Sequence, residues 1–109
     1  MKLHYVFFLV LISMDVLSEK YICKIIIDKT TNSSQTHLFE REGDFFTHSV
    51  DYKKLDPFNI IRETDRYVLL NKGIRIVMVE KLTKEVAQYW IGVPQLYKPE
   101  YGDCSVITT

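Results

Sequence analysis

The chain has 109 residues, enough for one domain at most, and 47% of its residues are hydrophobic. Its 14 basic and 14 acidic residues are scattered without blocks, so nothing in the charge pattern directs the protein to nucleic acid or to an anionic membrane surface. Two cysteines allow one disulfide at most.

The first eighteen residues have the layout of a secretory signal peptide. A basic start contains Lys2 and His4, an apolar core runs from Tyr5 to Met14, and Val16 and Ser18 stand where a signal peptidase would read. The apolar run is short for a membrane span. The alternative is a buried first strand or helix of a cytosolic protein. We expect a signal peptide at 1–18, a domain at 19–109 and a secreted product, because no second long apolar run follows.

The sequence of the first half of the domain predicts short strands. Glu19 to Ile27 is β-branched and apolar, and Thr36 to Phe39 and Asp44 to Val50 flank a Glu-Arg-Glu-Gly turn. Between the first two segments, Asn32-Ser33-Ser34 is an N-glycosylation acceptor, which needs an exposed turn to be used.

The middle of the domain is harder to assign. In Asp51 to Asp65, Asp56-Pro57 predicts a turn, and Phe58 to Arg62 suits either a strand or one helical turn. Arg66 to Leu70 and Ile74 to Val79 then read as strands on either side of an Asn-Lys-Gly turn.

Two more strands are expected after a corner at Leu82 to Glu85. They are Ala87 to Val93 and Gly102 to Thr109, with prolines at both ends of the intervening loop. Short strands, frequent turn signals and no long helical period indicate an all-β sandwich or barrel.

A sequence resemblance narrows this choice. Arg66-Tyr67-Val68-Leu69, the run Ile74 to Val79, and then Leu82 and Tyr89-Trp90-Ile91-Gly92-Val93 are similar to strands D, E and F of immunoglobulin V-set domains, notably in polymeric immunoglobulin receptor-like leukocyte receptors. The similarity covers about a third of the chain. It implies a V-type β-sandwich that is incomplete, because too few residues precede Cys23 for a strand A, and strand B is absent too if Cys23 belongs to strand C.

The resemblance also assigns structural roles. Tyr89 would close the E–F corner, and Arg66 would meet Glu85 or Val86 where the family has an aspartate. Ile91 replaces the strand-F cysteine and would refill core volume. If Cys23 lies in strand B, which the spacing favours, Phe39 takes the place of the buried strand-C tryptophan.

Both cysteines are expected to be free thiols. The position at which the resemblance would place a partner for Cys23 is Ile91, and Cys104 would lie in strand G, beside strand F. A bridge between Cys23 and Cys104 requires their Cα atoms to come within about 7 Å.

Trp90 is the candidate contact residue. Strand alternation places it on the face opposite Tyr89 and Ile91, the outer face of the predicted sheet. An exposed tryptophan is a plausible binding residue. Cover by Tyr97 or by the loop from Pro94 to Pro99 is the equally weighted alternative.

No catalytic, cofactor or metal pattern stands out. Cys23 with His37 or His48 lacks a catalytic signature, the cysteines and histidines match no zinc spacing, and the four glycines are isolated. We therefore expect no enzyme activity, no cofactor and no metal. The resemblance implies an extracellular binding domain with a protein or lipid ligand at the cell surface, or a fragment of a membrane receptor. The alternative is a small secreted all-β effector unrelated to immune receptors.

Overall fold

The computed structural model describes residues 19–92 and 98–108. This part of the chain forms eight strands: β1 Glu19–Asp28, β2 Ser33–Glu42, β3 Phe45–Val50, β4 Lys53–Glu63, β5 Tyr67–Lys72, β6 Arg75–Glu80, β7 Glu85–Trp90 and β8 Glu100–Thr108. Within it, no helix has the length and apolar character needed to cross a bilayer. The expected signal peptide at 1–18 lies outside the described residues.

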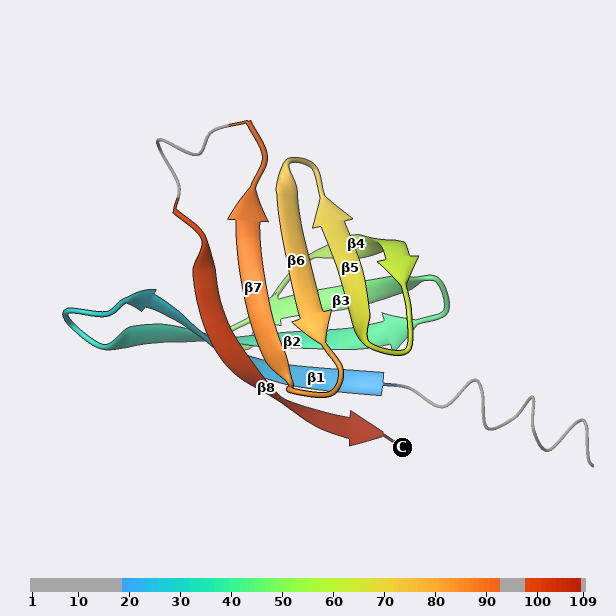
Figure 1. Cartoon of the computed structure of the whole chain (residues 1–109), viewed down its shortest axis with the longest axis horizontal. Helices are drawn as coiled ribbons and strands as arrows, with labels where there is room; N and C mark the ends of the chain where they lie inside the picture. The colour runs from blue at the N-terminus through green and yellow to red at the C-terminus, as the bar shows by residue number, and fades with distance from the viewer. Residues whose placement is uncertain (1–18, 93–97, 109) are drawn as a thin grey trace, which may run out of the picture.

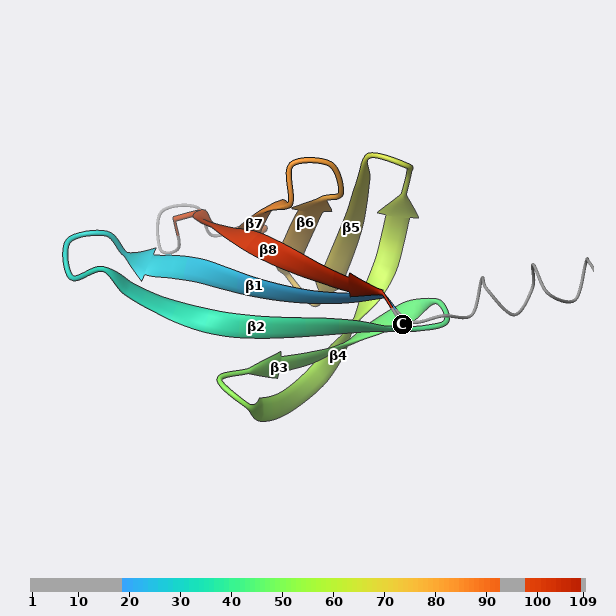
Figure 2. The same cartoon turned by 90° about the horizontal axis from the view of Figure 1, so that it is seen from below.

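The strands form one closed antiparallel barrel. Each strand pairs with the next along the chain, and β8 returns to pair with β1. Figures 1 and 2 show β5, β6 and β7 running across the direction of β1, β2 and β3, while β8 and β4 curve between the two groups. Irregular register between β3 and β4 and between β4 and β5 accompanies the bend of β4.

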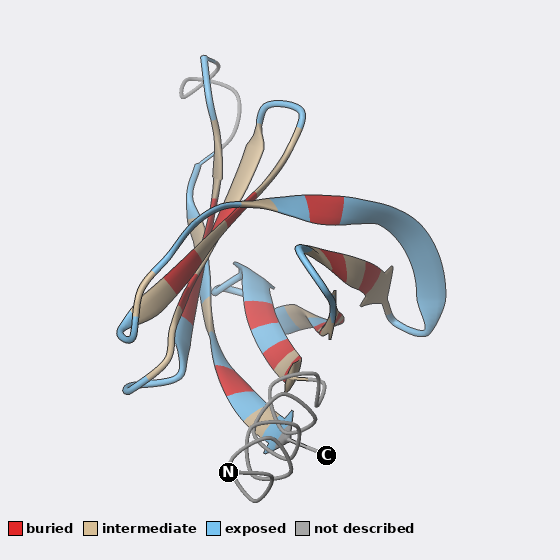
Figure 3. Cartoon of the chain, turned by 90° about the vertical axis from the view of Figure 1, so that its right-hand side faces the viewer, coloured by how far each residue is buried: buried red, intermediate tan, exposed pale blue. Residues whose placement is uncertain are grey.

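Alternation of side chains places the core inside the barrel. Along β1 the buried residues are Tyr21, Cys23 and Ile25, and the same period of two recurs on β2, β3, β5 and β6, as Figure 3 shows by its alternating colours. The core contains these three residues together with Phe39, Phe46, Phe58, Val68, Leu70, Val77, Val79, Val86 and Cys104.

The all-β prediction is confirmed, but the incomplete immunoglobulin sandwich is wrong. A sandwich would place the segment that became β7 in the sheet facing β5 and β6. Instead β7 pairs directly with β6, with Arg75 opposite Trp90 and Val79 opposite Val86. The turns on either side of β6 are short, so they join antiparallel neighbours and cannot carry the chain across to a second sheet.

The predicted turn at Asp56-Pro57 is also wrong, and the strand alternative for this region is confirmed. β4 runs through Pro57, which is exposed. Phe58 pairs with Phe46 and Leu55 with His48, so the register shifts at the proline. A bulge is one of the few places where a strand tolerates proline, because its missing N–H leaves no ladder bond unmade there.

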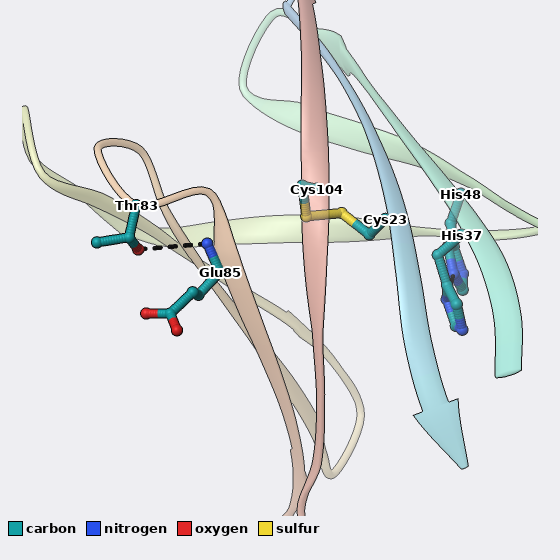
Figure 4. The surroundings of a disulfide bond; sticks show 6 residues. All are labelled: Cys23, His37, His48, Thr83, Glu85 and Cys104. Carbon is teal, nitrogen blue, oxygen red and sulfur yellow. Dashed lines mark hydrogen bonds between the residues drawn. A yellow bond between two sulfur atoms is a disulfide. The ribbon is translucent and has the colours of Figure 1, made fainter. Parts of the chain in front are cut away.

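The expectation of two free thiols is wrong as well. Cys23 and Cys104 are bridged, with Cα atoms 3.9 Å apart, and the described residues hold no free cysteine (Figure 4). The barrel closes by pairing β8 with β1, which sets these two residues directly opposite each other. Nearby, a Cβ on Gly102 would lie 1.9 Å from the Lys24 carbonyl oxygen, so the close approach of β8 to β1 requires glycine there.

Candidate functional site

The two ends of the barrel differ. The loop end carries the β1–β2, β3–β4 and β5–β6 turns and the connection from β7 to β8. The terminal end carries the other three turns together with Glu19 and Thr108. Polar side chains enter the barrel at the loop end from six strands: Gln35 and His37 on β2, His48 on β3, Lys72 on β5, Arg75 on β6, Gln88 and Trp90 on β7, and Glu100 on β8.

These side chains face inward because they continue the alternation of the core. Lys72 follows Leu70 by two residues, and Arg75 precedes Val77 by two. Gln88 follows the buried Val86 in the same way and is itself only 1% exposed. The inner face of each strand therefore changes from apolar to polar as it approaches the loop end.

A hollow of about 540 Å³ opens at the loop end. Its lining combines apolar, aromatic and charged groups: Ile26, Ile27, Lys29, Gln35, Arg75, Gln88, Trp90, Lys98, Pro99, Glu100 and Tyr101. Three of these residues are cationic and one is anionic, so the described lining has a formal charge of 3 − 1 = +2. A basic lining of this kind attracts an anion.

Arg75 lies at the centre of the polar lining. Its Nε donates to Gln88 Oε1 at 2.7 Å, and Gln88 Nε2 donates to Glu100 Oε1 at 2.8 Å. Its guanidinium carbon lies 5.7 Å from the ring centre of Phe58 and 5.8 Å from that of Trp90. Burial lowers the pKa of Arg75 and the Glu100 carboxylate opposes this effect, but arginine keeps its charge at any physiological pH.

A second chain of hydrogen bonds lies deeper in the barrel. His37 Nδ1 and His48 Nε2 are 2.9 Å apart, and Lys72 Nζ lies 3.1 Å from His48 Nδ1. Lys72 also donates to the Asp56 carbonyl oxygen at 2.7 Å. Both histidines are fully buried, and His48 stacks on Phe39 with ring centres 4.9 Å apart.

Burial keeps both histidines neutral. Loss of solvent lowers the pKa of His37 to about 4, and the charges of Arg75 and Lys72 lower it further against the opposing Asp51. Burial, followed by the Lys72 charge, lowers the pKa of His48 to about 3. In the described part of the chain, one buried side-chain nitrogen or oxygen lacks a hydrogen-bond partner, and it is His37 Nε2.

Trp90 and Tyr89 lie on the faces opposite to those expected. Trp90 follows the inward-facing Gln88 by two residues and lines the hollow, so the prediction of an outer-face tryptophan is wrong. Tyr89 lies on the outer face of β7, where it borders a second, smaller depression of about 320 Å³ with Met78 and Tyr101. It closes no corner by a hydroxyl bond within the described residues. The direct pairing of β7 with β6 sets these directions.

The other structural predictions have mixed outcomes. Phe39 is buried, as expected for a core aromatic. Ile91 is 58% exposed and refills no core volume, because β7 ends at Trp90 and Ile91 begins the next turn. Arg66 lies exposed in the β4–β5 turn, and its side chain pairs with neither Glu85 nor Val86. Asn32 is exposed in the β1–β2 turn with a φ of 59°, and its glycosylation stays a prediction.

The polar part of the barrel interior is not identified from the sequence. His37 and His48 are named from it only as catalytic partners of Cys23, whose sulfur is in the disulfide. No role is given to Lys72, Arg75 or Gln88. One signal in the sequence could have indicated them. At one end of several predicted strands, a polar residue stands two positions from an apolar one and so shares its face. Over residues 19–92 and 98–108, no group of three potential ligands for a metal ion comes together.

Comparison with protein-family models, with curated proteins and with solved structures finds no match for this chain. The resemblance to V-set receptors therefore remains a prediction from the sequence. The function has to be argued from the barrel and its hollow.

Proposed function

We propose that this protein is an extracellular binding protein that holds a small organic anion with an apolar part in the hollow at the loop end. The observation that carries the proposal is the hollow itself, of about 540 Å³ with a net positive lining around Arg75. Its size falls within the range of small-molecule sites, which combine an apolar wall with a few convergent polar groups.

The lining supports a ligand with two chemical parts. Within the described residues, Arg75 makes its one side-chain hydrogen bond through Nε, so its two terminal nitrogens keep their donors for a ligand. A carboxylate or phosphate matches that fork. Ile26, Ile27, Pro99 and Trp90 supply apolar and aromatic surface for the rest of the molecule.

The extracellular location is part of the proposal. It is supported by the signal-like leader at 1–18 and by the bridge between Cys23 and Cys104, since stable disulfides form in oxidising compartments. The expected lipid ligand at a cell surface shares the proposed chemistry, because an anionic lipid also joins a charged head to an apolar chain. A cell-surface protein partner stays a prediction from the sequence.

Trp90 provides the measurement, because it is the only tryptophan of the chain and lines the hollow. The secreted protein is titrated with inorganic phosphate, benzoate, octanoate and vesicles containing phosphatidylserine, and Trp90 fluorescence and binding heat are recorded. We expect benzoate or octanoate to change the fluorescence and to bind more tightly than phosphate, which lacks an apolar part. Binding of the vesicles alone would identify a lipid surface as the source of the anion.

Arg75→Met is the decisive variant. Loss of the charge is expected to weaken binding by at least about tenfold, which corresponds to about 1.4 kcal/mol. Arg62→Met is the matched control, because Arg62 is exposed on β4 and lies outside the hollow lining. Absence of any fluorescence change or heat with all four probes would overturn the proposal.

A further inference from the structure

The pair of buried histidines carries an inference that rests on the proposed function and extends it. Lys72 as an ammonium can only donate, so His48 Nδ1 must accept its hydrogen bond. Neutral His48 then carries its proton on Nε2. That proton is donated to Nδ1 of His37, 2.9 Å away.

The same logic fixes the tautomer of His37. Its Nδ1 is an acceptor, so its proton lies on Nε2, the buried nitrogen that lacks a partner in the described structure. A buried N–H without an acceptor is destabilising, because it loses its hydrogen bond to water and gains no other. The chain of donors that begins at Lys72 therefore ends in an N–H that needs an acceptor.

The side chain of His37 lies toward the loop end. In Figure 4 the ring of His37 extends alongside β1 toward the arrowhead of that strand, which marks its Asp28 end. On β2, Gln35 lines the hollow and His37 is the next residue on the same inner face. At about 3.3 Å per residue, His37 lies one step of roughly 7 Å deeper in the barrel than Gln35.

We propose that His37 lies directly below the hollow, outside its present lining, and that its Nε2–H donates to an acceptor oxygen of a bound anion that reaches past Gln35. The groups that face the pair are Lys72 from β5, Arg75 from β6 and Asp51 from the β3–β4 turn. Arg75 supplies the charge at the rim of the hollow and His37 supplies a fixed, neutral donor below it. The ligand class is thereby narrowed to anions whose acceptor oxygen reaches below Arg75.

The first test is nuclear magnetic resonance of the wild-type secreted protein with ¹⁵N-labelled histidine. His37 and His48 are the only histidines after the leader, and both are expected to carry their proton on Nε2 near pH 7. Saturating benzoate is expected to shift the His37 Nε2–H signal downfield and to leave that of His48 nearly unchanged. A proton on Nδ1 of His37, or a His37 signal that does not move when benzoate binds, would overturn the inference.

The second test uses variants titrated with benzoate. His37→Phe keeps a flat ring and removes the donor, so we expect affinity to fall by at least about tenfold. His37→Gln places an amide N–H near the former Nε2 and is expected to lose only about threefold. Val68→Ala, a buried change on β5 toward the terminal end, controls for loosening of the barrel and should bind within about twofold of wild type.

The outcomes separate this inference from the proposed function. Unchanged binding by His37→Phe, alongside lost binding by Arg75→Met, would refute the role of His37 and leave the binding function standing. No binding of benzoate, octanoate, phosphate or the phosphatidylserine vesicles to the wild type would refute both. If His37→Phe fails to fold, the tautomer measurement on the wild type and the His37→Gln titration still decide.

Discussion

The terminal end and the loop end of the barrel differ in how their charged side chains are paired. At the terminal end, Arg41 donates from Nε to Glu19 at 2.8 Å and from a terminal nitrogen to Glu63, while Lys81 lies 2.7 Å from Glu63. Tyr21 donates to the second oxygen of Glu19 at 2.7 Å. The two cations and two anions of this cluster cancel.

The loop end has no such balance. The described lining of its hollow has a net positive charge, and a buried donor on His37 stays unpaired. A satisfied network seals and rigidifies one end of a barrel, whereas unsatisfied groups at the other end raise the energy of the empty state and favour a ligand. This difference matches the proposed function, in which the terminal end serves stability and the loop end serves binding.

The disulfide joins β1 to β8, the pair of strands that closes the barrel, so its removal should have the largest effect on stability. Cys23 and Cys104 are 81 residues apart, and the loss of this cross-link should destabilise the fold by about 4 kcal/mol through the entropy of the unfolded chain. We expect Cys23→Ala combined with Cys104→Ala to lower the urea midpoint strongly. The double variant is also titrated with benzoate. If binding is lost to the same extent as folding, both ends of the barrel depend on the closure of β8 onto β1. A midpoint like that of wild type would contradict this prediction.

Acid should weaken the loop end before the terminal end. The buried histidines have pKa values of about 4 and about 3 in the folded protein, against an ordinary value of 6.5. Below pH 6.5 the unfolded chain therefore binds protons that the folded protein does not, so stability falls as pH falls. For two histidines the loss between pH 6.5 and 4.5 is on the order of 4 kcal/mol.

Urea titrations at half-unit pH steps measure this loss. His48→Phe removes one of the two titrating groups, so we expect the pH slope to fall by about half. In the terminal cluster, burial acts to raise the pKa of Glu63, but Lys81 and Arg41 outweigh it and lower the pKa below 4.5. The stability contribution of Glu63 is therefore lost only below pH 4.5. A slope that is equal in His48→Phe and wild type would assign the acid sensitivity elsewhere.

The strands were predictable from the sequence and their closure was not. Alternating apolar residues locate β1, β3, β5 and β6 to within a few residues of their observed bounds. A sandwich and a barrel use the same alternation, so only the partner of each strand distinguishes them. The pairing of β8 with β1 joins the two ends of the described chain and depends on contacts distant in sequence. The pairing of β7 with β6 is local, and the resemblance of the Tyr89-Trp90 run to another fold assigned β7 to the wrong sheet.

The site was less predictable than the fold. Trp90 lines the hollow, and its role as a contact residue stays a prediction. Its predicted direction is wrong because the resemblance assigns the strand to another sheet. His37 and His48 lie in segments predicted as strands, yet their hydrogen bond depends on the register in which Phe39 pairs with His48 across β2 and β3. Periodicity gives the inner face of each strand. It does not give which inward residues meet.

Replacement of Arg41 tests the charge cluster at the terminal end directly. Arg41→Met should leave Glu19 and Glu63 without their shared cation and should remove the guanidinium that lies 5.0 Å from the ring centre of Phe46. We expect a loss of about 2 kcal/mol, the scale of hydrogen bonds to charged groups. Urea unfolding at pH 7 measures it against Arg62→Met, which should change stability by less than about 0.5 kcal/mol. Benzoate affinity should stay within about twofold of wild type, and a larger fall would mean that the two ends are coupled.

Arg75→Met completes the comparison and should have the smallest effect on stability. Arg75 is partly buried in the hollow, where the Glu100 carboxylate favours its charge and Lys72 and the histidines oppose it. Its removal costs the hydrogen bond to Gln88 but relieves that repulsion, so we expect a net change of less than about 1 kcal/mol in urea unfolding. The same substitution should weaken benzoate binding at least about tenfold. Arg41 and Arg75 would then show opposite patterns, one affecting stability alone and the other binding alone. A loss of stability in Arg75→Met as large as in Arg41→Met would show that Arg75 is a structural residue and that the loop end is sealed like the terminal end.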